Sequence, residues 1–150
     1  MLNLETTLTR IFPEHVTAAS LNGSRLTEGG MAEHIGIEFV EVGANFITAK
    51  MPVDHRTRQP MGLLHGGASV ALAETIASVA AYCLLDWEKQ YAVGLEINAN
   101  HIRSARDGYV YGTATPLHIG KTTQVWQTEI RDDHQNLICI SRMTVAILNK

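Results

Sequence analysis

The sequence has little of several features that define common protein classes. Among 150 residues there are only two cysteines, Cys83 and Cys139, which lie far apart and outside any Cys-x-x-Cys spacing. This excludes a disulfide framework and favours free thiols in a reducing compartment. The seven histidines form neither a His-Glu-x-x-His pattern nor a Cys/His cluster at ligand spacing. No metal site is therefore expected.

The chain also lacks an excess of basic charge and a targeting segment. Its formal net charge of −3, without a basic stripe along a helix, gives no reason to expect nucleic acid. The N-terminus has no basic region followed by an apolar core, so the cytoplasm is the expected location. The apolar run 68–85 carries Glu74 near its middle. A central acid opposes membrane insertion by about 2.5–3.5 kcal/mol, so we expect a buried helix and no membrane insertion.

The order of patterns predicts an α+β protein with one domain over residues 1–150. Residues 3–20 are weakly helical and broken by Pro13, and residues 1–30 are expected to pack on the core as an extension. A longer helix should run from the His65-Gly66-Gly67 turn to Leu85. Segments rich in β-branched and aromatic residues, separated by turn sequences, predict six strands in an antiparallel sheet: 35–42, 45–53, 91–102, 109–117, 122–131 and 137–148.

The start of the long helix carries the chemistry. Gly66 and Gly67 place bare backbone N–H groups there, where a developing negative charge is stabilised. Glu74 is the only charge further along, and burying a carboxylate without a function is costly. Glu74, Ser78 and Tyr82 are spaced i, i+4, i+8 and share a face, so Ser78 could bond the carboxylate or hold a water. An oxyanion site with a nearby acid is typical of acyl transfer.

Several segments resemble the acyl-CoA thioesterases of the hotdog fold, in which a curved six-stranded sheet wraps one long helix. The similar segments are MPVD (51–54), RT (56–57), QP (59–60), GLLHGGAS (62–69), VGLEINANH (93–101), RSAR (103–106), PLHIG (116–120) and QVWQ (124–127). They resemble the branch that includes 4-hydroxybenzoyl-CoA thioesterase, and within it the 1,4-dihydroxy-2-naphthoyl-CoA hydrolases of menaquinone biosynthesis. The resemblance covers residues 31–148.

The resemblance implies roles for individual residues. Glu74 would be the nucleophile or the general base, and both remain open. Gly66 would donate its N–H to the oxyanion, Gln59 would assist at the thioester carbonyl, and His65 would orient the thioester or Gln59. The set of catalytic candidates is thus Glu74, Gly66, Gln59, His65 and Ser78. Candidates for binding the aromatic acyl group are Val79 and Tyr82, and those for the anionic end of coenzyme A are His101, Arg103 and Arg106.

Each of these assignments has a plainer alternative. Glu74 can pair with a basic residue, the two glycines can serve a tight turn, and His65 can cap the helix. Gln59 and the arginines can be solvated, and Val79 and Tyr82 can be core residues.

The resemblance further implies a homo-oligomer, a dimer of dimers in which Gln59, His65 and Gly66 of one subunit face Glu74 and Ser78 of the next. The substrate would be a small-molecule acyl-CoA, with no other cofactor. The alternatives are a proofreading thioesterase acting on an aryl or acyl carrier protein in siderophore synthesis, a hotdog hydratase or dehydratase, and a non-catalytic acyl-CoA-binding hotdog protein.

Overall fold

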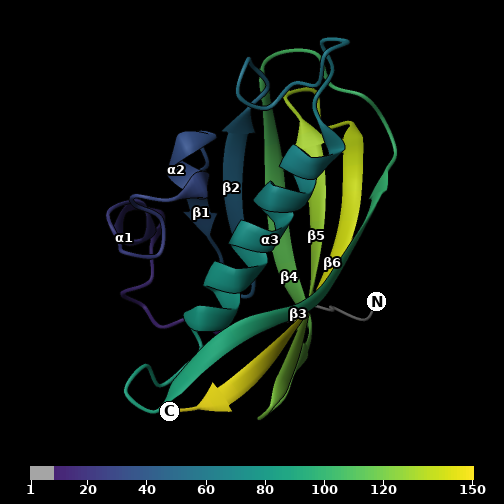
Figure 1. The fold of residues 1–150 in the computed structure, drawn as a ribbon. Helices are drawn as coiled ribbons and strands as arrows, with labels where there is room; N and C mark the ends of the chain where they lie inside the picture. Colours follow the sequence, from purple (N-terminus) through teal and green to yellow (C-terminus); the bar gives the residue numbers. More distant parts are fainter. Residues whose placement is uncertain (1–8) are drawn as a thin grey trace, which may run out of the picture.

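A six-stranded antiparallel sheet and one long helix make up most of the structure (Figure 1). The computed structural model describes residues 9–150. The strands follow the order β1-β2-β4-β5-β6-β3 across the sheet. The elements are α1 (Ala18–Asn22), α2 (Met31–His34), β1 (Glu38–Val42), β2 (Ile47–Pro52), α3 (Gly66–Tyr82), β3 (Gln90–His101), β4 (Tyr109–Ile119), β5 (Thr123–Asp132) and β6 (Leu137–Asn149).

Helix α3 packs against one face of the sheet and forms the centre of the core (Figure 1). Leu72 and Ile76 are fully buried there. Opposite them on β4 is Gly112, where a Cβ atom would stand 2.7 Å from Ile76 Cδ1. The absence of a side chain at this position therefore lets the helix approach the sheet closely. Within residues 9–150, no helix has the length and apolar character needed to cross a membrane.

The predicted six strands and long helix are confirmed, with shifts at their ends. Helix α3 ends at Tyr82, three residues before the predicted end at Leu85. Strand β4 continues to Ile119, two residues beyond its predicted end, because a bulge between Pro116 and His118 carries the pairing with β5 past the proline.

The N-terminal segment differs from the helical prediction. Residues 3–8 of the predicted helical segment lie outside the described residues, and residues 9–17 are not helical. Only α1 forms, started by a capping box between Thr17 and Ser20, and the separate short helix α2 was not predicted. Tertiary contacts override the weak helical pattern here: Phe12 is buried and stacks on Trp126 with ring centroids 6.2 Å apart.

The segment 9–35 thus contributes several buried side chains to the core. The side-chain amide of Asn22 makes two hydrogen bonds to the backbone of Phe39 in β1, both 2.8 Å long. Val16 and Leu21 are buried beside Phe12 in the same core. Because β1 is an edge strand, these contacts cover one side of the sheet.

The other edge strand, β3, is open, and its first half exposes apolar side chains. It pairs only with β6, and a bulge interrupts this pairing between Gly94 and Glu96. Tyr91, Val93 and Leu95 are 38%, 38% and 63% exposed. An exposed apolar edge is a template for pairing with another chain.

The role of Phe12 in the core gives a stability prediction. Phe12→Ala should lower the free energy of unfolding by about 3–5 kcal/mol, because it leaves a cavity beside Trp126. Urea unfolding measures the change, and Glu14→Ala, at an exposed neighbouring position, is the matched control, expected within about 0.5 kcal/mol of wild type. A loss below about 1 kcal/mol for Phe12→Ala would show that the segment is not part of the cooperative core.

Candidate active site

The loop between β2 and α3 is held by the buried residue Thr57. Its hydroxyl donates to the carbonyl oxygen of Pro52 at 2.6 Å and accepts from the Asp54 N–H at 3.1 Å. Its own carbonyl oxygen accepts from the His65 N–H at 2.8 Å. Thr57 therefore connects the end of β2 to the start of α3, and it positions the residues between them.

An ion pair stabilises the first turn of this loop. Arg56 lies 2.7 Å from the Asp54 carboxylate, and the hydrogen bonds from its side chain and its backbone N–H lower the Asp54 pKa to about 2. The carboxylate therefore stays ionised at any pH where the protein would be assayed.

At the helix start, His65 forms the N-cap. Its Nδ1 accepts a hydrogen bond from the Gly67 N–H at 2.8 Å. A neutral His65 therefore carries its proton on Nε2 and can act there only as a donor. The capping alternative for His65 is thus present in the structure, and it is compatible with an orienting role.

The Gly66 N–H is left free by this arrangement. Within residues 9–150 no atom accepts a hydrogen bond from it. His101, at the end of β3, packs so closely that a Cβ atom on Gly66 would stand 2.8 Å from its Nε2. Only glycine fits this position without a shift, and the free N–H lies at the positive end of the α3 dipole.

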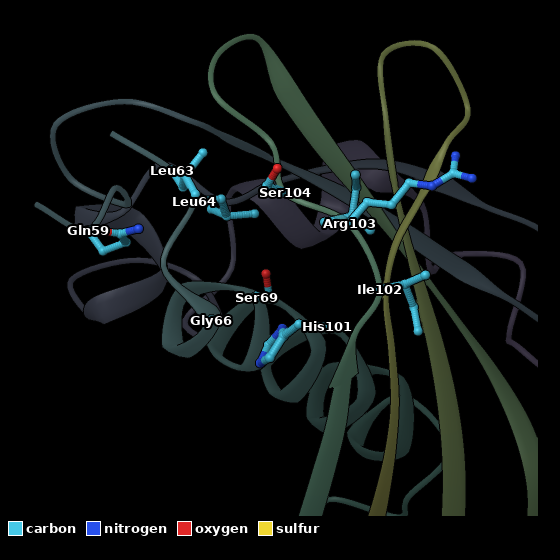
Figure 2. Close-up of a pocket in the computed structure, with 10 residues that line it drawn as sticks. Gln59, Leu63, Leu64, Gly66, Ser69, His101, Ile102, Arg103 and Ser104 are labelled. Carbon is cyan, nitrogen blue, oxygen red and sulfur yellow. The ribbon is translucent and has the colours of Figure 1, made fainter. Parts of the chain in front are cut away.

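Gln59 and His101 line one cavity with Gly66. The cavity has a volume of about 390 Å³ and lies between the β2–α3 loop, the start of α3 and the end of β3 (Figure 2). The Gln59 side-chain oxygen accepts from the Met61 N–H at 2.6 Å. Because this bond uses the side-chain oxygen of Gln59, the NH2 group of the same amide is available as a donor.

The two arginines predicted to meet coenzyme A take different positions. Arg103 lines the same cavity, but its guanidinium donates to Asn136 at 3.1 Å and extends away from Gly66 (Figure 2). Arg106 is exposed and does not line the cavity. The structure therefore brings together Gln59, Gly66, His101 and Arg103, with Arg106 outside their cavity.

Glu74 lies elsewhere on α3, in a second cavity of about 460 Å³ between the helix and residues 25–32. The expectation of a buried carboxylate is wrong for the single chain, because Glu74 is exposed. Of the two roles considered for Ser78, the hydrogen bond to Glu74 is not among the hydrogen bonds within residues 9–150. Ser78 instead bonds the sulfur of Met143 at 3.8 Å.

Val79 and Tyr82 line a third, smaller cavity of about 140 Å³, together with Ser78. The Tyr82 ring packs against Trp87 with centroids 5.4 Å apart, and the indole N–H donates to the Tyr82 carbonyl oxygen at 2.8 Å. Trp87 therefore fixes the ring that forms the end of this cavity.

Within one chain, the catalytic candidates Gln59 and Gly66 lie apart from Glu74 and Ser78. Glu74 lies eight positions after Gly66 on α3, which is about 12 Å along the helix axis at 1.5 Å per residue. A thioester carbonyl placed at the Gly66 N–H would therefore be out of reach of Glu74 in the same chain. One chain thus has the Gly66 N–H and the Gln59 amide in one cavity and Glu74 in another.

Sequence reasoning assigned no role to several lining residues. The first cavity is also lined by Leu63, Leu64, Ser69, Ile102, Ser104 and Ile138, and the second by residues 25–28 and 30–32. Leu63, Leu64, Ser69 and Ser104 lie in the segments similar to thioesterases, which is the signal that could have found them. Only the tertiary structure identifies Ile138 and the lining residues within 25–32, because they come from distant segments. Among residues 9–150, no group of three or more His, Cys, Asp or Glu is placed to hold a metal ion.

The comparisons with known proteins agree with this geometry. Residues 61–139 match the Thioesterase superfamily, which is more than half of the chain. The chain belongs to this superfamily. It has the hotdog fold and is a thioester hydrolase. A solved thioesterase of Haemophilus influenzae superposes with a TM-score of 0.86 at 47% identity, covering 93% of this chain and 95% of that one.

Named relatives are similar over nearly the full length. The 1,4-dihydroxy-2-naphthoyl-CoA hydrolase of Escherichia coli is 53% identical over 92% of this chain and 99% of its own. The proofreading thioesterase of Cronobacter turicensis is 44% identical over 92% and 98%. A Staphylococcus aureus thioesterase has been solved as a glutamine-to-alanine variant, at 43% identity and a TM-score of 0.74 over 77% of this chain and 95% of that one. The same protein has also been solved as a glutamate-to-alanine variant, at 42% identity and a TM-score of 0.78 over 81% and 100%.

The position of Thr57 gives a prediction for the loop. Thr57→Val keeps the shape but leaves the Pro52 carbonyl and the Asp54 N–H without their partner, which should cost about 1–3 kcal/mol of stability. Thiol release should also slow, because the loop that carries Gln59 and His65 loses the two hydrogen bonds that the Thr57 hydroxyl makes to Pro52 and Asp54 at its start. Thr122→Val, at an exposed threonine, is the matched control and should leave both properties near wild type. Unchanged stability and turnover in Thr57→Val would remove the anchoring role.

Proposed function

We propose that this thioesterase hydrolyses an aromatic acyl-CoA at a site shared between two chains. The observation that carries the proposal is the free Gly66 N–H at the start of α3, in one cavity with the Gln59 amide donor. Two such donors are suited to the oxygen of a thioester carbonyl as it becomes an oxyanion. The roles assigned to the site residues below belong to the same proposal.

Glu74 provides or activates the attacking group. As a nucleophile, its carboxylate adds to the carbonyl carbon, the C–S bond breaks to release the CoA thiolate, and water hydrolyses the resulting mixed anhydride. As a general base, it takes a proton from a water molecule that adds to the same carbon, and the C–S bond then breaks to release the CoA thiolate and the free acid. In both routes the Gly66 N–H and Gln59 stabilise the tetrahedral oxyanion, His65 orients the thioester or Gln59, and Ser78 holds a water beside the carboxylate.

The separation of about 12 Å along α3 supports a shared site. The exposed apolar strand β3 is a suitable edge for pairing with a second copy. Pairing there would extend the sheet and cover the apolar side chains of both edges. We infer a homodimer whose two sites each combine Gln59, His65 and Gly66 of one chain with Glu74 and Ser78 of the other, with a dimer of dimers as the full assembly.

The ends of the substrate follow from the surrounding residues. His101 and Arg103, at the mouth of the first cavity, would meet the phosphates of coenzyme A, with Arg106 close by in sequence. Val79 and Tyr82 would contact the acyl group. Coenzyme A enters as part of the substrate, and no other cofactor is proposed.

The 1,4-dihydroxy-2-naphthoyl-CoA hydrolase of E. coli supports this acyl-CoA as the substrate, with the free acid and CoA as products. We propose that the reaction belongs to menaquinone biosynthesis in the cytoplasm. In the S. aureus thioesterase, the two altered residues are as far apart in sequence as Gln59 and Glu74 are here, which supports the pairing of these two. The similarity to the proofreading thioesterase favours a second candidate, aryl groups on a carrier protein.

The first test is the role of Glu74. Wild type should release free thiol from 1,4-dihydroxy-2-naphthoyl-CoA and benzoyl-CoA faster than from a medium-chain acyl-CoA. Glu74→Ala should slow turnover by about 10²–10⁴-fold. Glu88→Ala, which removes an exposed acid outside the cavities, is the control and should keep wild-type rates. Preference for an aryl carrier protein would favour the second candidate, and no thiol release from any ester would favour a hydratase or a binding protein.

Mixed dimers test the shared site. Inactive Gln59→Ala and Glu74→Ala chains, co-assembled, should regain activity, because each mixed dimer contains one site with both residues intact. Each purified mixed dimer should therefore show about half of wild-type turnover if its two sites act independently. Gln59→Ala mixed with the double variant has no intact site and should remain inactive. An inactive mixed dimer of the first kind would refute the shared site.

A further inference from the structure

Two cavities adjoin along α3. The larger one contains Glu74 and the smaller one ends at Tyr82, and both are lined by Leu26, Ser78 and Val79. Glu74 lies close to their junction, since its Oε1 would be 3.5 Å from a Cβ atom on Gly94, which lines the smaller cavity. A group attached to a carbonyl beside Glu74 can therefore extend from one cavity into the other.

Leu26 lines both cavities. Among the described residues it is the only one outside α3 that lines both. Its side chain is half-buried and packs against the core. Val79 also lines both cavities, and the rest of the smaller cavity, with Tyr82, Ala92 and Val145, is largely apolar. Such a lining suits a flat apolar group.

The turn that carries Leu26 is built by local hydrogen bonds. The Leu26 N–H donates to the Ser24 hydroxyl at 3.2 Å, and that hydroxyl donates to the Leu21 carbonyl oxygen at 2.8 Å. The Thr27 hydroxyl donates to the same carbonyl oxygen at 2.7 Å. Leu21 is buried in α1, so the turn has a fixed base. The position of the Leu26 backbone is thus set by its hydrogen bonds to the end of α1.

We propose that Leu26 is a specificity-determining residue for the acyl group. Its size sets how large an aromatic ring system can pass from Glu74 toward Tyr82. The inference rests on the proposed function, because it takes Glu74 as the position of the thioester carbonyl. It also assigns a substrate contact to residues 1–30, which the resemblance to known thioesterases does not cover.

The test compares a one-ring and a two-ring ester, benzoyl-CoA and 2-naphthoyl-CoA. The quantity measured is the ratio of kcat/KM for 2-naphthoyl-CoA to that for benzoyl-CoA. Leu26→Phe should lower this ratio at least tenfold, because it narrows the passage, and Leu26→Ala should raise it, because a single ring loses its wall. Leu117→Ala, which truncates an exposed leucine on β4 outside both cavities, is the matched control and should keep the wild-type ratio.

A binding measurement separates this inference from the proposed function. The dissociation constants of both esters are measured by calorimetry on a Glu74→Gln background, where hydrolysis does not interfere, and their ratio should shift in the same directions. If wild type releases no thiol, the proposed function fails, and the binding ratio still decides on Leu26. If both ratios stay within twofold of wild type in folded Leu26→Phe and Leu26→Ala, the inference is overturned. If one variant fails to fold, the other decides alone.

Discussion

The close packing of α3 against the sheet is the constraint on which the rest of this structure depends. Gly112 on β4 and the fully buried Leu72 and Ile76 on α3 allow contact without an intervening side chain. A helix held this closely cannot rotate or slide without breaking many contacts, since protein interiors are packed to near crystal density. The free N–H at its start and the carboxylate further along are therefore held at fixed positions. The distance between them is a property of the helix.

This fixed distance is the physical basis for the proposal that two chains share each site. Charge that develops on a thioester oxygen is best stabilised at the N-terminus of a helix, where N–H groups have no helical partners. An acid on the same helix at Glu74 is too far away to attack the same carbonyl. A second copy of the same helix, placed beside the first, removes the conflict. The open β3 edge offers a way to place it.

The proposed site draws on the helix and on two loops. Gly66 and Glu74 lie on the rigid helix, whereas Gln59 and Leu26 come from loops. Each loop is held by hydrogen bonds of its own, through Thr57 in one case and Ser24 in the other. Loops anchored in this way can change their side chains without disturbing the sheet. In the proposed function the helix and Gln59 carry the chemistry, and in the further inference Leu26 adjusts the choice of acyl group.

The sequence by itself determined the element order, the long helix and the candidates near its start, because alternation, helix formers and turn residues act locally. It did not determine the extent of α1. Burial of Phe12 and Val16 in the core outweighs the weak helical preference of the segment before α1. It also did not show that Glu74 is exposed in the single chain or that Ser78 bonds Met143. Nor did it show that Leu26 lines the same cavity as Glu74 and Ser78. These facts depend on which distant segments meet. Only the tertiary structure decides that, because contacts between residues far apart in the chain leave no periodic pattern within it.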